Sequence, residues 1–299
     1  MCAEKMHENE VLADANLVRR LLAAQIPQWA ELPISPLPLG GTDNALYRLG
    51  NEMVVRLPRI DWALASREKE LEWLPKLAPL VPFEIPTQLA LGRPGKGYPW
   101  PWAVYRWLEG EDPSIHVEVD RDALEPDIVG FVEAMHEIDL SGGPRAQRGA
   151  PLRTVDAPTR DAIDILADTI DRDAALAVWQ GALAVPPWER DPVWLHGDLD
   201  ARNMLVEDGR LSAVIDWGSV GVGDPACDIS VAWKLFSPSV REVFRSELKV
   251  DDATWDRARA GTLSQAVIAL AYYTTKTNPV LVQEARRWLA AVLTDPGTA

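Results

Sequence analysis

A short polar run enclosed by apolar residues constrains this chain more than any other feature. The run has the pattern H-x-D-L-x-x-x-N and extends from His196 to Asn203. Two apolar runs follow it, Met204–Val206 and Leu211–Ile215, and the Asp-Gly pair between them is a strong signal for a two-residue hairpin turn. We therefore expect a polar loop that leads directly into a β-hairpin.

The hairpin predicts where polar side chains gather. With the Asp-Gly pair at the centre of the turn, Asn203 is expected to face Val214 on the opposite strand. Asp216 then extends past Asn203 at the same open end, and it lies on the same side because side chains alternate along a strand. Asp198 lies just upstream. This arrangement depends on the assumed register, and a longer loop would shift it.

The gathered oxygen atoms suggest a particular chemistry. Amide and carboxylate oxygens suit Mg²⁺, which completes its shell with water and substrate phosphates. Phosphoryl transfer asks a protein mainly for positioning and for neutralisation of charge. We therefore expect Asp198 to orient an acceptor hydroxyl and take its proton, while Asn203 and Asp216 hold Mg²⁺ on nucleotide phosphates. His196 is expected to brace the loop.

Composition restricts the class of protein further. The formal net charge of -15 argues against nucleic acid as a partner, because phosphate backbones bind basic surfaces. It is compatible with small cationic substrates, although an acidic surface also simply favours solubility. No stretch approaches the roughly 20 apolar residues that span a bilayer, and the polar start does not resemble a signal peptide. Cys2 and Cys227 suggest no disulfide framework, so a cytoplasmic protein without membrane contact is expected.

The chain changes character near residue 107. Before this point, strands are expected at 45–49, 53–57, 88–92 and 102–108, with a first helix that Asp14 caps and a second at 66–77. After it, helices are expected at 127–138, 159–180, 228–236, 239–248, 254–276 and 281–293. The sequence therefore predicts an α+β protein with an N-terminal domain at 1–107 and a mostly helical domain at 108–299.

Five further segments, distributed over almost the whole chain, carry a family resemblance. They are Gly40–Gly50, Val54–Arg59, Tyr105–Gly110, Ile215–Gly218 and Gly223–Asp228. With the polar run, they resemble the aminoglycoside phosphotransferase family of small-molecule kinases and the related macrolide phosphotransferases. The resemblance implies a bilobal protein-kinase-like fold, with a small antiparallel-sheet N-lobe, a larger helical C-lobe and ATP or GTP in the cleft between them. No A-P-E-like segment follows, which argues against a protein kinase.

The resemblance also implies a charged pair for the nucleotide phosphates. Arg56 occupies the position where kinases commonly carry lysine, and its forked guanidinium can still contact phosphate. Glu70 is the expected partner from the following helix. We prefer it to Glu68 and Glu72 because it precedes the apolar face of that helix in the expected phase.

Other nucleotide contacts are expected from the same resemblance. Thr42 lies in a Gly-Gly-Thr-Asp-Asn loop that departs from the G-x-G-x-x-G pattern, and its hydroxyl and the loop amides would meet phosphate oxygens. An ordinary turn is the alternative. Backbone groups around Tyr105 and Trp107 would meet the purine, with core packing as the alternative for their side chains. Asp228 is expected to brace the loop that carries Asp198.

Two features bear on the acceptor. Asp200, two residues beyond Asp198, is placed to meet an amine, although it is equally compatible with a surface loop. Acidic residues also recur along one face of the helix expected from residue 159, and a bound polycation would relieve the repulsion between them. The alternative is an ordinary helix face that is exposed to solvent. The acidic residues are Asp161, Asp164, Asp168 and Asp171.

The hypothesis that follows is a kinase for a hydroxyl of an aminoglycoside-type antibiotic, with a small, cationic acceptor. A macrolide phosphotransferase, or a metabolic kinase for choline, homoserine or a sugar, is the alternative. A nucleotide-binding scaffold without catalysis is a further alternative, which the presence of Asp198, Asn203 and Asp216 disfavours.

Overall fold

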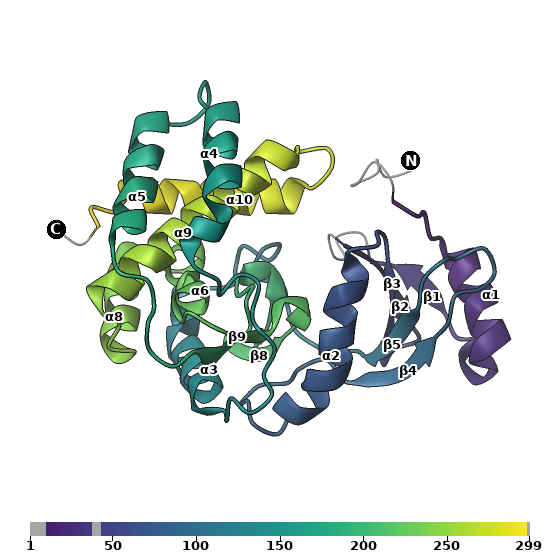
Figure 1. The fold of residues 1–299 in the computed structure, drawn as a ribbon. Coiled ribbons are helices and arrows are strands. Elements are labelled where there is room, and N and C mark those ends of the chain that lie inside the picture. Colours follow the sequence, from purple (N-terminus) through teal and green to yellow (C-terminus); the bar gives the residue numbers. More distant parts are fainter. Residues whose placement is uncertain (1–9, 38–42, 298–299) are drawn as a thin grey trace. The chain divides into compact units, whose positions relative to one another are not determined.

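A computed structural model describes residues 10–37 and 43–297. The chain divides into two compact units. The first unit comprises the chain up to Pro79 together with Glu84–Glu109, and the second comprises Leu80–Phe83 and the chain from Gly110 onward. The first is built on an antiparallel sheet and the second is mostly helical (Figure 1). The predicted α+β class is confirmed.

The sheet of the first unit has five strands in the order β1-β2-β3-β5-β4, and all neighbours are antiparallel. The strands are β1 (Ile34–Pro36), β2 (Asn44–Leu49), β3 (Met53–Pro58), β4 (Gln88–Gly92) and β5 (Trp102–Arg106). The short strand β1 was not predicted, because its segment is rich in proline. Pro36 is tolerated there since β1 lies at the edge of the sheet, where a missing N–H costs no bond between two strands.

The first helix, α1 (Ala15–Gln25), begins as predicted at Asp14, whose carboxylate accepts a hydrogen bond of 2.6 Å from the N–H of Leu17. Its apolar side chains are buried in one core with residues of the sheet. The helical residues of this core are Leu17, Val18, Leu21 and Leu22. Spacing at three and four residues therefore positions α1 on one face of the sheet.

The opposite face of the sheet carries polar side chains. Val55 and Val104 belong to the core that α1 covers. Because side chains alternate along a strand, their neighbours Arg56 and Tyr105 point to the other face. There both contact the helix α2 (Ala63–Leu77). Strand alternation thus directs a charged group and a hydroxyl toward α2.

In the part of the chain that the structure describes, the second unit combines helices with two short antiparallel strand pairs. These are β6 (Val193–Leu195) with β9 (Gly221–Gly223), and β7 (Met204–Glu207) with β8 (Arg210–Val214). Its helices are α3 (Glu125–Glu137), α4 (Asp156–Ile165), α5 (Arg172–Ala184), α6 (Ala226–Ile229), α7 (Val231–Leu235), α8 (Pro238–Glu247), α9 (Asp252–Tyr272) and α10 (Pro279–Thr294). The long helix α9 contacts α4, α5, α6 and α10 (Figure 1). In the part of the chain that the structure describes, no helix is long and apolar enough to cross a membrane.

The prediction of one continuous helix over 159–180 is wrong, because the structure contains two helices there. α4 ends at Ile165, and α5 begins at Arg172 after the N-cap Asp171, whose carboxylate accepts a hydrogen bond of 3.0 Å from the N–H of Ala174. Aspartate is favoured at such an N-cap and disfavoured inside a helix. The expected acidic face therefore does not form, and Asp164 instead pairs with Arg172 at 2.8 Å.

Candidate active site

The hairpin turn forms as predicted, but the register of its strands differs. Asp208 and Gly209 have φ angles of 51° and 75°, as a two-residue turn between twisted strands requires. The strands are β7 (Met204–Glu207) and β8 (Arg210–Val214), and their register shifts between Leu205 and Val206. This bulge adds one residue to β8. The register expected from the turn alone was therefore wrong by one residue.

The bulge changes the partner of Asn203. Val214 pairs with Met204, and the carbonyl oxygen of Asn203 accepts a hydrogen bond of 2.9 Å from the N–H of Ile215. Asp216 follows at once in the left-handed conformation, with φ 60° and ψ 65°, and is exposed. A left-handed aspartate is uncommon and often marks a functional turn. Asn203 and Asp216 thus lie at the same end of the hairpin.

Asp228 anchors the loop that carries Asp198. It is buried, and its two oxygens accept hydrogen bonds from the N–H groups of His196 (2.7 Å) and Gly197 (2.9 Å). At the other end of the loop, the side-chain amide of Asn203 donates to the carbonyl oxygen of Asp198 at 2.8 Å. The bracing expected of Asp228 is confirmed, and two side chains fix the backbone on both sides of Asp198.

His196 is buried and binds backbone groups through both ring nitrogens. Its Nε2 lies 3.0 Å from the carbonyl oxygen of Ile215, and its Nδ1 accepts a hydrogen bond of 3.3 Å from the N–H of Asp198. Burial lowers the pKa of His196, even though Asp228 and Asp216 act in the opposite direction. A neutral ring that donates from Nε2 satisfies both contacts, so His196 braces the loop as expected.

Asp200 is fully buried beneath the loop. It caps the short 3-10 helix Ala201–Asn203, and its carboxylate pairs with the guanidinium of Arg202 at 2.6 and 3.0 Å. Burial opposes ionisation, but Arg202 and the nearby Lys234 hold the pKa of Asp200 below its usual value. These contacts favour a role inside the loop. The amine contact proposed from the sequence stays a prediction.

Arg148 was not expected near the site. Its guanidinium forms an ion pair with Oδ1 of Asp198. The side chain of Asp198 is 16% exposed and that of Arg148 is 42% exposed. Nothing in the sequence around Arg148 has a recognisable spacing, so only the three-dimensional structure identifies this neighbour.

The first unit contains the predicted charged pair. Nη1 of Arg56 lies 2.8 Å from each carboxylate oxygen of Glu70, which is buried. Asn44, with its amide oxygen turned toward the guanidinium, accepts from Nε and Nη2 of Arg56 at 3.1 and 3.0 Å. Glu72, a rival partner, instead pairs with Lys76 on the surface. The helix phase thus identified the correct glutamate.

The other residues predicted to bind nucleotide have different surroundings. Tyr105 is buried and donates to Glu70 at 3.3 Å, and burial together with Glu70 raises the pKa of its hydroxyl. The N–H of Trp107 donates to the carbonyl oxygen of Glu52 at 2.8 Å, so this amide is engaged within the unit. Thr42 lies outside the described residues. The purine and phosphate contacts of these three residues stay predictions.

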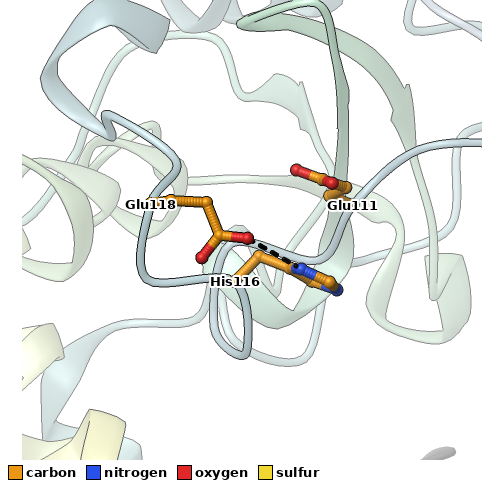
Figure 2. Close-up of side chains that lie close together, drawn as sticks. All are labelled: Glu111, His116 and Glu118. Carbon is orange, nitrogen blue, oxygen red and sulfur yellow. Dashed lines mark hydrogen bonds and ion pairs between the residues drawn. The ribbon is translucent and has the colours of Figure 1, made fainter.

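Figure 2 shows a separate group of side chains that could hold a metal ion. One ligand atom from each of Glu111, His116 and Glu118 lies within 4.8 Å of the others. Nδ1 of His116 is 3.3 Å from Glu118, and both glutamates are exposed. The imidazole contact accounts for the position of Glu118, and exposed carboxylates are well solvated without a metal. The group includes none of the residues predicted for Mg²⁺.

Cavities of the described part of the second unit differ in size and in lining. A small one, of about 30 Å³, is lined by Arg148, Cys227, Gln265 and neighbouring residues, and is large enough for water only. A larger groove, of about 720 Å³, is lined by residues of α9, α10 and the link between α4 and α5. None of the predicted site residues lines the larger groove.

Comparison with known families identifies the class of protein. The family model described as the phosphotransferase enzyme family matches residues 34–261, which is more than half of the chain. The chain therefore belongs to the phosphotransferase enzyme family, as the sequence segments indicated.

Individual relatives agree with this family. An Escherichia coli aminoglycoside 3'-phosphotransferase is 32% identical over 78 residues, which are 25% of this chain and 29% of that protein. The chain thus spans less than a third of the length of this relative. The structure of the GDP and kanamycin complex of APH(2")-IIia has a TM-score of 0.70 at 17% identity, over 91% of this chain and 98% of that one.

A second solved structure is that of the macrolide 2'-phosphotransferase MphH from Brachybacterium faecium. It has a TM-score of 0.58 at 21% identity and covers 96% of this chain and 99% of that one. At such identities the likeness concerns the fold, and it confirms the predicted kinase-like fold class.

Proposed function

We propose that this chain is a kinase that transfers the γ-phosphoryl group of ATP or GTP to a hydroxyl of a small molecule. One observation carries the proposal. Asp198, Asn203 and Asp216 lie on a single loop and hairpin whose backbone is fixed by two buried side chains, Asp228 and His196. Membership of the phosphotransferase enzyme family supports it.

The side chains suit the steps of such a reaction. Asp198 would accept a hydrogen bond from the acceptor hydroxyl and take its proton as the oxygen bonds to phosphorus. Asn203 donates through its amide nitrogen to the carbonyl oxygen of Asp198, which leaves the amide oxygen as a hard ligand. With the carboxylate of Asp216, this oxygen fits Mg²⁺. Bound Mg²⁺ would neutralise charge on the nucleotide phosphates.

Arg56 is proposed to contact those phosphates. Glu70 and Asn44 hold its guanidinium from two sides, so it loses little freedom when it binds an anion. Thr42, Tyr105 and Trp107 are proposed to contact the same nucleotide. The names of solved relatives, which include complexes with GDP and with ATP, support a nucleotide of this kind.

The first acceptor class we propose is an aminoglycoside-type antibiotic. The relatives named above support this class, because they include an aminoglycoside 3'-phosphotransferase and a structure with kanamycin bound. A panel of aminoglycosides, macrolides, choline, homoserine and sugars tests it by release of nucleoside diphosphate, with ATP and GTP compared at fixed Mg²⁺. Stimulation by aminoglycosides alone is the expected result. Nucleotide binding without release for any acceptor would instead indicate a scaffold.

A further inference from the structure

We infer that Arg148 is a specificity-determining residue, which restricts the reaction to acceptor hydroxyls that have no ammonium group beside them. The inference rests on the proposed function, because it takes Asp198 as the group that receives the hydroxyl proton. Arg148 forms an ion pair with Asp198 and is the more exposed partner, at 42% against 16%. An acceptor that approaches Asp198 from solvent therefore meets the guanidinium first.

The position of Arg148 is fixed by the backbone on both sides. The N–H of Ala146 donates to the carbonyl oxygen of Val222 at 2.9 Å, and the N–H of Asp224 donates to the carbonyl oxygen of Gly149 at 3.0 Å. These bonds tie the loop around Arg148 to the strand β9 (Gly221–Gly223). Arg148 therefore starts from an anchored backbone close to Asp198, while its long side chain keeps the freedom to turn.

The loop that carries Asp198 offers little to an ammonium group of an acceptor. The neighbouring acid, Asp200, is buried and its charge is neutralised by Arg202. On the other side of the loop, the ammonium of Lys234 lies 3.3 Å from the carbonyl oxygen of Leu199. An ammonium group beside the reacting hydroxyl would thus approach the guanidinium of Arg148 and a carboxylate already paired with it, while the carboxylate of Asp216 is proposed to hold Mg²⁺.

A neutral or anionic substituent has the opposite effect. Its oxygen atoms can accept hydrogen bonds from the guanidinium of Arg148 and draw it away from Asp198, which releases the carboxylate for the hydroxyl proton. The cavity of about 30 Å³ beside Arg148 is too small for an acceptor, so this cavity offers the acceptor no second position next to the side chain. Within a molecule that has both amines and hydroxyls, hydroxyls flanked by oxygen substituents are therefore the favoured ones.

Three sugars of one ring type test the inference: glucuronate, glucose and glucosamine carry charges of about -1, 0 and +1 beside comparable hydroxyls. Their binding to the wild type, R148A, R148K and R148E would be measured by ligand-observed NMR titration, with circular dichroism to verify folding. Arg286→Ala is the matched control, since it removes an exposed arginine of α10.

We expect the wild type to bind glucuronate about tenfold more tightly than glucosamine, a ratio typical of one added charge interaction. R148A should lose this preference, R148E should invert it, R148K should retain it, and Arg286→Ala should leave it unchanged. The same order in the wild type and R148E, or no measurable binding of any sugar, would overturn the inference.

Turnover separates this result from failure of the proposed function. For any acceptor found in the panel, R148E should raise kcat/KM for amine-flanked hydroxyls relative to neutral ones by about tenfold. An equal loss for all acceptors would mean that Arg148 is only structural. If the wild type phosphorylates nothing yet the sugars bind in the predicted order, the kinase proposal fails and the charge preference at Arg148 stands.

Discussion

The two units hold their charged groups in different ways. In the first unit, Arg56 and Glu70 come from a strand and a helix of regular geometry, and each side chain is engaged by the other. In the second unit, Asp198 lies on an irregular loop whose shape depends on buried partners distant in sequence, such as Asp228. The first arrangement follows from local periodicity, whereas the second requires the folded unit.

The largest effect is expected at the loop of the second unit. Asp198→Ala should lower the rate of transfer by about 10³-fold, within the usual range for loss of a general base, while nucleotide binding stays nearly unchanged. Single-turnover transfer and nucleotide titration measure the two quantities. Near-normal turnover in this variant would remove Asp198 from the mechanism.

Asp216→Ala should have the next largest effect, on binding rather than on chemistry. Loss of a proposed Mg²⁺ ligand should weaken Mg²⁺-dependent nucleotide affinity by about 100-fold, comparable to losing one electrostatic contact in an active site. Nucleotide titrations at several Mg²⁺ concentrations measure this change. The same affinity at every concentration would contradict the metal role, and Glu207→Ala, which removes an exposed carboxylate of the same hairpin, is the control.

Lys234 is a buried lysine of the second unit, and its contribution to the stability of the protein should depend on pH. Burial lowers its pKa from 10.5 to about 8, although Asp200 acts in the opposite direction. Between these values the unfolded chain binds more protons, so the lysine's contribution to stability rises with pH over about 8–10.5. This shift corresponds to about 3 kcal/mol.

The measurement compares urea unfolding of the wild type and Lys234→Met from pH 7 to 10.5. The free energy of unfolding of the wild type should increase relative to that of the variant across the window. Both proteins would carry Cys227→Ala, because the raised pKa of this thiol depends in part on Lys234. A constant difference would show that the ammonium is solvated in the folded state.

The smallest effect is expected in the first unit. Glu70→Ala removes the carboxylate that pairs with Arg56 and should lower the free energy of unfolding by about 2 kcal/mol, as for a lost hydrogen bond to a charged group. Glu72→Ala, which removes a surface pair of the same helix, should cost less than about 0.5 kcal/mol. If denaturant titrations gave the same loss in free energy of unfolding for both variants, the expected difference between a buried and an exposed ion pair would be contradicted.

Sequence reasoning succeeded where a local rule decides the structure. The change from strands to helices along the chain gave the α+β class, and the Asp-Gly pair gave the hairpin turn. The family resemblance gave the pairing of Arg56 with a helix glutamate, and helix phase selected Glu70 for it. It failed where tertiary contacts compete with such rules. The bulge in β8, the burial of Asp200 against Arg202 and the contact of Arg148 with Asp198 depend on packing that no spacing in the sequence reveals.

The bulge in the hairpin has a consequence for how this chain can vary. It adds one residue between Asn203 and Asp216, and the side-chain period of a strand is two. A single-residue insertion or deletion there would shift the pairing of β7 with β8 by one residue, whereas substitutions at exposed positions such as Arg210 leave the register intact. In homologous chains, the length of this segment should therefore vary less than its residues.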